Sequence, residues 1–273
     1  MNLEELKLLL EKEISPIIFK KPSEVYGFHY SNSVYKKKIK KIMITRDLNL
    51  KSLHFAIKNK INLIISLKGL IHKPIIDFNP NLINKLSLLS KYPISIFVLS
   101  SSFYAAEGGI SDTIIEALFL KLDHSVEIKN SNGISIPIGR ICIPNFYPGI
   151  SKPFTLENLI ERIRSNMNIN SILYLGEIKS IINRICIIGG ENFFDKHLDE
   201  ILTQGCDCFI TERVKRSTID YLNDLGLNFI EIPFFNCEVL ALKKLCNYLS
   251  LKFPYDEFCL FNSRNPLKLY TKP

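Results

Sequence analysis

Hydrophobic positions along the chain follow two periods. Some stretches are apolar at nearly every residue, as in INLIIS at 61–66, which is typical of strands buried on both faces of a sheet. Between them, apolar residues recur every three or four positions, as in amphipathic helices. The main predicted strands are 40–46, 61–66, 94–100, 185–188, 207–211 and 228–232, and the main predicted helices are 2–14, 50–59, 81–91, 109–120, 156–167, 195–204, 215–225 and 238–250. This alternation predicts an α/β layered fold with a largely parallel sheet.

The alternation is interrupted once, by a looser segment at 123–153. Strand and helix signals resume after it, so we expect two α/β domains. We assign residues 1–124 to the first domain, completed by residues 232–273, and residues 125–231 to the second.

Composition supports a folded protein. Of 273 residues, 47% are hydrophobic, which is enough for one large core or two ordinary ones. Charged residues interrupt every apolar run before it reaches the length of a membrane span. The first residues form an acidic amphipathic pattern rather than a secretory signal, so we expect a cytoplasmic protein. Seven cysteines in mostly apolar contexts predict reduced, buried thiols.

The formal net charge of +8 favours an anionic partner, nucleic acid above all. The lysine-, isoleucine- and asparagine-rich composition can equally reflect an A+T-rich genome. The densest basic run is either a solvated loop or an anion-binding segment, and it contains Lys36, Lys37, Lys38, Lys40 and Lys41.

Familiar catalytic motifs are absent from the sequence. It has no Walker A loop, no dinucleotide-binding glycine fingerprint and no evident Ser-His-Asp order. Five scattered histidines include no pair spaced to hold a metal.

Ligands of α/β proteins bind beyond the carboxyl ends of strands, so the residues that follow each predicted strand are the candidates. These segments supply the cations Lys68, Arg213, Lys215 and Arg216 and the acids Asp47, Glu107, Glu212 and Glu238. They include no histidine and no nucleophile beside a base. The alternative is that these are ordinary solvated loop charges.

The segments at the strand ends of the first half resemble, in order, those of the Nif-three-like family, also called the GTP cyclohydrolase I type 2 or YbgI-like family. Arg46-Asp47-Leu48-Asn49 is similar to the Leu-Asp-x-Thr turn of that family. Leu67-Lys68-Gly69-Leu70-Ile71 stands at its His-His-Pro turn. Ser100 to Tyr104, followed by Gly108-Gly109-Ile110-Ser111-Asp112, resembles its His-Thr-x-x-Asp and Gly-Gly-x-x-Asp segments.

The second half continues the resemblance. Gly139-Arg140 and the later TLENL resemble the Gly-Arg and Thr-Leu-x-x-Leu segments. The segment ICIIGGE resembles the glycine turn of the family, and DCFITERVKRSTIDYL resembles its Asp-x-x-x-Thr-Gly-Glu-x-x-His-His segment. The segment PFFNCEVLAL resembles the His-Ser-Asn-Thr-Glu segment of the eukaryotic members. The resemblance implies two α/β layered domains with a cleft between them and a pair of divalent metals held there by histidines and carboxylates.

Most of the implied metal ligands are replaced in this chain. The histidine pair corresponds to Leu67 and Lys68, and the next His and Asp correspond to Ser100 and Tyr104. A later His corresponds to Phe234, and only Glu238 keeps a ligand. Lys68 would repel a cation placed beside it by about 4 kcal/mol per unit charge at 4 Å and an effective dielectric of 20. We therefore expect no catalytic residue, no bound metal and no cofactor.

The favoured function is that of a pseudoenzyme, a non-catalytic factor that binds an anionic partner. RNA is the expected partner, with a ribosome-associated, idling or dormancy-type factor as one concrete form. The expected contacts to it are Lys36, Lys37, Lys38, Lys40, Lys41, Lys68, Arg213, Lys215 and Arg216.

Two alternatives remain open. The chain could be a metal-dependent hydrolase with displaced ligands at Asp47, Glu107, Glu212 and Glu238. It could also be a protein-interaction scaffold, since the resemblance implies a closed homo-oligomer.

Overall fold

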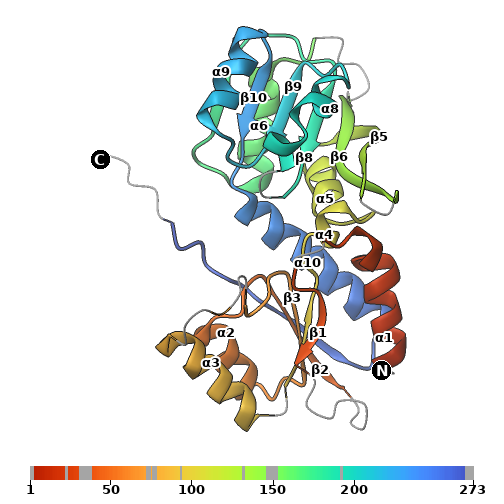
Figure 1. Cartoon of the computed structure of the whole chain (residues 1–273), viewed down its shortest axis with the longest axis vertical. Coiled ribbons are helices and arrows are strands. Elements are labelled where there is room, and N and C mark those ends of the chain that lie inside the picture. The colour runs from red at the N-terminus through yellow and green to blue at the C-terminus, as the bar shows by residue number, and fades with distance from the viewer. Residues whose placement is uncertain are drawn as a thin grey trace. The chain divides into compact units, whose positions relative to one another are not determined.

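The structure, a computed structural model, describes residues 3–21, 24–30, 39–71, 75, 79–92, 94–130, 133–145, 153–190 and 193–267 (Figure 1). The chain forms two compact units. The first unit consists of Met1–Glu13, Lys20–Ser100 and Ala241–Pro273, and the second of Ile14–Phe19 and Ser101–Leu240. The units are thus divided near residues 100 and 240, whereas the sequence led us to expect divisions near 124 and 231.

The sheet of the first unit is built around four parallel strands. Its order is β1-β4-β3-β2-β11, and only β1 is antiparallel to its neighbour. The strands are β1 (Gly27–Tyr30), β2 (Lys41–Thr45), β3 (Leu63–Ser66), β4 (Ser95–Val98) and β11 (Glu257–Phe261). Every residue of β3 and β4 is buried, which explains why these strands read as continuous apolar runs.

Helices cover this sheet. They are α1 (Leu3–Leu9), α2 (Leu50–Lys58), α3 (Pro80–Lys91) and the later part of α10 (Phe234–Lys252). Asn49 begins α2 through a capping box in which its side chain accepts from the Ser52 backbone and the Ser52 side chain accepts from the Asn49 backbone. The core beneath α2 and α3 includes Met43, Leu53 and Ile64.

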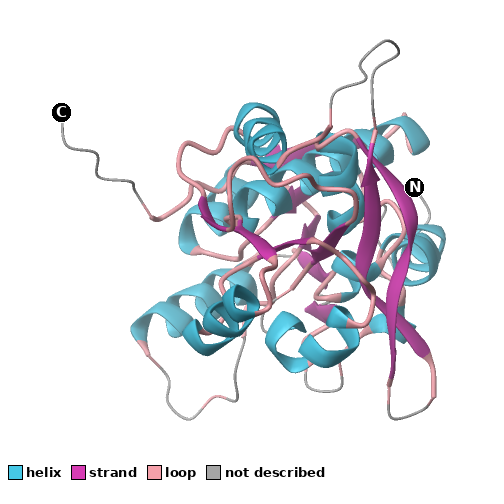
Figure 2. Ribbon diagram, turned by 90° about the horizontal axis from the view of Figure 1, so that it is seen from above, coloured by secondary structure: helices cyan, strands magenta, loops and turns pink. Residues whose placement is uncertain are grey.

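The second unit holds a mixed sheet in the order β5-β6-β8-β9-β10-β7. The parallel strands are β8 (Ile185–Ile188), β9 (Cys208–Thr211) and β10 (Asn228–Glu231). The antiparallel strands are β5 (Leu120–Lys129), β6 (Ser135–Pro144) and β7 (Leu173–Leu175). The helices are α4 (Ser102–Ala105), α5 (Ile110–Ala117), α6 (Leu156–Met167), α7 (Phe193–Lys196), α8 (Leu198–Leu202), α9 (Arg216–Asp224) and the first residues of α10. Figure 2 shows the helices of the chain in cyan and its strands in magenta.

The structure confirms the α/β fold class and corrects several elements. The looser segment expected at 123–153 contains most of the long hairpin β5–β6. Most residues at the start of β5 are solvent-exposed, so the strand lacks the apolar run by which the other strands were found. The helix predicted at 195–204 is divided between α7 and α8 at His197, and the one predicted at 2–14 ends in a π-helical turn, Leu10–Ile14.

All seven cysteines are free thiols and six of them are buried, as the sequence predicted. Among the residues described, no helix is long and apolar enough to cross a membrane.

Candidate functional site

In the first unit, the residues after β2, β3 and β4 extend the ladder of the sheet. The backbone N–H of Leu67 donates to Thr45 O and that of Lys68 to Arg46 O, both at 3.0 Å. The N–H of Ser100 donates to Leu67 O at 3.0 Å. The structure therefore brings the predicted positions Leu67, Lys68 and Ser100 together at one edge of the sheet.

Two of these side chains are committed to the protein itself. Leu67 is 1% exposed and belongs to the core. The Ser100 hydroxyl donates to Glu24 Oε2 at 2.7 Å, and Ser100 adopts a left-handed backbone conformation with φ of 61°. Neither side chain offers the imidazole that the resemblance implies at its position.

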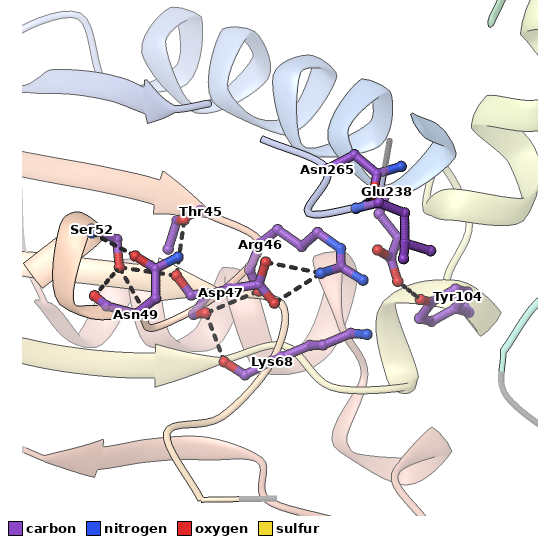
Figure 3. A network of polar contacts seen from close by, with 11 residues as sticks. Thr45, Arg46, Asp47, Asn49, Ser52, Lys68, Tyr104, Glu238 and Asn265 are labelled. Carbon is purple, nitrogen blue, oxygen red and sulfur yellow. Dashed lines mark hydrogen bonds and ion pairs between the residues drawn. The ribbon is translucent and has the colours of Figure 1, made fainter. Parts of the chain in front are cut away.

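Cations gather at this strand edge. Arg46 Nη1 donates to both carboxylate oxygens of Asp47, at 2.9 and 2.8 Å. Figure 3 shows the Arg46 and Lys68 side chains extending in the same direction from the ends of β2 and β3. Lys85 of α3 also interacts electrostatically with Asp47. Burial lowers the pKa of Lys85, and attraction to the Asp47 carboxylate partly offsets this shift. Lys85 was missed because nothing in the sequence relates that helix position to a strand end.

In the second unit, the structure brings Tyr104, Phe234 and Glu238 together. The Tyr104 hydroxyl donates a hydrogen bond to Glu238 Oε1 (Figure 3). Glu238 is only 2% exposed, so this bond lies in the protein interior. The rings of Tyr104 and Phe234 lie 6.1 Å apart. The one retained carboxylate is therefore bonded to the residue at the implied Asp position.

A buried ion pair explains two further segments of the resemblance. Arg140 is 3% exposed, and its Nε donates to Asp112 Oδ1 at 2.6 Å. Its Nη2 donates to Ala105 O at 2.9 Å, and Asp112 Oδ2 accepts from Gly108 N at 2.7 Å. These bonds join β6 to the α4–α5 turn. Gly139-Arg140 and the Gly-Gly-x-x-Asp segment therefore have a structural role.

Arg213, Lys215 and Arg216 lie on the surface of the second unit, where α9 begins. Arg216 Nε donates to Asp220 Oδ1 at 3.0 Å. The first turn of α9 is held by the Asp195 carboxylate, which accepts from Lys215 N at 3.3 Å and from the Thr218 hydroxyl at 2.5 Å. The backbone N–H groups at the start of a helix can bind an anion, but here Asp195 already accepts from one of them. Anion binding by this cluster would therefore depend on the side chains of Arg213, Lys215 and Arg216.

The predicted lysine run is described only in part. Lys36, Lys37 and Lys38 lie outside the described residues. Lys40 is exposed, and Lys41 Nζ pairs with Glu257 Oε2 at 2.7 Å.

The side chains that the structure describes do not gather into a metal site. Of the four candidates for displaced ligands, Asp47 belongs to the first unit and Glu107, Glu212 and Glu238 to the second. Asp47 is paired with Arg46, and Glu238 with Tyr104. Within the described part of the chain, no group of three or more His, Cys, Asp or Glu side chains could hold a metal ion. This donor set does not fit the two-metal centre that the resemblance implies.

Comparisons with known proteins agree with this fold. The chain is 24% identical over 265 residues to a Clostridium perfringens protein named GTP cyclohydrolase 1 type 2 homolog, with 94% of each chain covered. A Bacillus cereus protein related to NIF3 superposes with a TM-score of 0.81 at 14% identity, and a Staphylococcus aureus hypothetical protein with 0.81 at 19% identity. Each superposition covers 99% of both chains.

The sequence model of one family, described as Duf34/NIF3 (NGG1p interacting factor 3), matches residues 1–266 of the chain. This match covers nearly the whole sequence and confirms the resemblance inferred from the strand-end segments. The chain therefore belongs to the Duf34/NIF3 family.

Proposed function

We propose that this chain is a non-catalytic NIF3-family protein, a pseudoenzyme, that binds an anionic partner in the cytoplasm. RNA is the proposed partner, most concretely RNA of the ribosome. The proposal includes no metal and no cofactor.

The observation that carries the non-catalytic part is the state of the implied ligand positions. Leu67 lies in the core, Ser100 is bonded to Glu24, and Tyr104 is bonded to Glu238. A metal that activates water needs several convergent nitrogen or oxygen ligands with an open coordination position. At these positions the chain has no histidine and a single carboxylate, Glu238, which is already hydrogen-bonded to Tyr104.

Charge supports the anionic partner. The net charge is +8, and Arg213, Lys215 and Arg216 form an exposed cluster that the phosphates of an RNA backbone could reach. Lys40 and Lys68 are further described members of the proposed contact set. Arginine binds phosphate through paired N–H donors, and each phosphate contact releases counterions from RNA.

The test is RNA binding by filter retention over a salt series, followed by co-sedimentation with ribosomes. The key variant is R213Q/K215Q/R216Q. The matched control is K51Q/K58Q/K60Q, which removes the same charge from exposed lysines at α2. The plot of log K against log salt has a negative slope, and loss of three phosphate contacts should make that slope less steep by about 2. Absence of binding at low salt, or equal losses in both variants, would refute the proposal.

The hydrolase with displaced ligands remains the second candidate, favoured only by the family name of its relatives. Metal analysis of the purified protein distinguishes it, since about two bound divalent ions per chain would support it. For the scaffold alternative, light scattering would have to give the mass of a closed ring.

A further inference from the structure

The first unit contains a cavity at the amino-terminal ends of β2 and β11. Lys68 and Ser100 follow the carboxyl ends of strands in the same sheet, so the cavity lies at the other end of the strands. Its volume is about 510 Å³, within the range of small-molecule sites. The end of α2 and the turn between α10 and β11 complete its wall.

The charges of this wall favour a cation. Lys41 and Glu257 line the cavity as an ion pair, and Asp256 adds a second acid, so the lining carries a net charge of −1. Asn59, the C-cap of α2, also lines the cavity, and the carbonyl end of a helix carries a partial negative charge. Other lysines nearby do not line it and are exposed to solvent, namely Lys40, Lys58 and Lys60.

Two aromatic rings give the cavity fixed apolar faces. Phe55 packs against Phe261 with ring centroids 5.3 Å apart. Phe258 stacks on Phe253 at 6.3 Å with an interplanar angle of 26°. Phe55 and Phe258 both line the cavity. The face of such a ring attracts an organic cation and also covers its apolar portion.

We propose that this cavity binds a small primary amine in its ammonium form, with an apolar group attached. The acidic rim holds the ammonium, and the phenylalanine rings receive the apolar group. This proposal does not rest on the proposed anionic partner, because it concerns a ligand of the opposite charge. Lys41 belongs to the expected basic contact set, but in the cavity it is the ion-pair partner of Glu257.

The chain contains its own reporter for the cavity. Cys259 lines it and is half-buried, whereas the other six cysteines are buried. A small alkylating reagent should therefore modify the native protein at Cys259 first. Burial raises the pKa of the Cys259 thiol, Glu257 raises it further and Lys41 opposes this, so alkylation is best followed at mildly alkaline pH.

The experiment measures the alkylation rate of Cys259 by peptide mass spectrometry with three probes of similar size. These are phenethylammonium, neutral 2-phenylethanol and anionic 3-phenylpropanoate. A ligand that excludes the reagent slows the reaction by the factor 1 + [L]/Kd, about elevenfold at ten times Kd. We expect protection in the order ammonium, alcohol, carboxylate. Equal protection by the carboxylate, or none by the ammonium, would overturn the proposal.

Two substitutions at the rim ion pair sharpen the test. E257Q removes an acid and should weaken phenethylammonium binding by about two- to fivefold, whereas K41Q removes the competing cation and should strengthen it by a similar factor. If the ion pair only supported the local structure, both variants would change affinity in the same direction. The matched controls are E157Q and K179Q, which break an exposed ion pair of the second unit and should change nothing.

Discussion

The hydrogen bond from Tyr104 to Glu238 leads to a sharp prediction for the variant Y104F. The substitution removes only the hydroxyl and keeps the ring that packs on Phe234. Glu238 is 2% exposed, so water cannot readily replace the lost donor. A buried hydrogen bond to a carboxyl group of this kind is worth about 1.5–3 kcal/mol, and we expect the free energy of unfolding to fall by that amount.

Urea unfolding followed by circular dichroism measures this loss. The control is Y221F, which removes the same atom from a half-exposed tyrosine of the second unit and should cost below about 0.5 kcal/mol. In a double-mutant cycle, E238Q should cost less in the Y104F background than in the original protein, because the two side chains act as a pair. A loss below about 0.5 kcal/mol in Y104F would refute the reasoning. So would a clear loss of stability of the unmodified protein in chelator, since that would assign Glu238 to a metal.

Three further variants test the second unit. R140M should lower the free energy of unfolding by about 3–5 kcal/mol in urea titrations, because it leaves the largely covered Asp112 carboxylate without its cation. G109A should prevent the α4–α5 turn from forming and yield little folded protein by circular dichroism, because an added Cβ would lie 2.1 Å from Phe103 O. G133A is the milder comparison, because its added Cβ would meet no other atom and only the left-handed backbone, with φ of 74°, would add strain. Y104D/F234H should bind about one zinc ion per chain by metal analysis, whereas F234H alone should bind none.

The sequence predicted the elements whose signals are local. Buried parallel strands such as β3 are made almost entirely of apolar residues, and the structure shows that α2 and α6 each begin at a capping box formed by residues three positions apart in the sequence. The hairpin β5–β6 was not predicted because most positions at the start of β5 are exposed and do not follow the period of a strand. Strand β7 was not predicted because it is only three residues long.

The candidate site was predictable to the same limited degree. Strand ends located Leu67, Lys68 and Ser100 at one edge of the sheet, since parallel strands end together. The partners of these side chains depend on tertiary contacts. No pattern along the chain indicates that Glu24 accepts a hydrogen bond from the Ser100 hydroxyl or that Lys85 lies near Asp47. The Tyr104–Glu238 bond joins residues 134 positions apart, which sequence periodicity cannot relate.

That bond also decides which substitutions would be needed to build a metal site at these positions. Phe234 and Glu238 are one helical turn apart on α10, so F234H would place an imidazole on the same helix face as the carboxylate. In that variant, however, Tyr104 would still donate its hydroxyl to Glu238, and a metal would have to displace a buried hydrogen bond to gain its second ligand. Y104D removes the competing donor and supplies a third ligand, which is the number that zinc sites with an open water position use. Building a metal site at these positions would therefore take more than added histidines, because Tyr104 already donates to the buried Glu238 carboxylate and must be replaced before an ion can bind there.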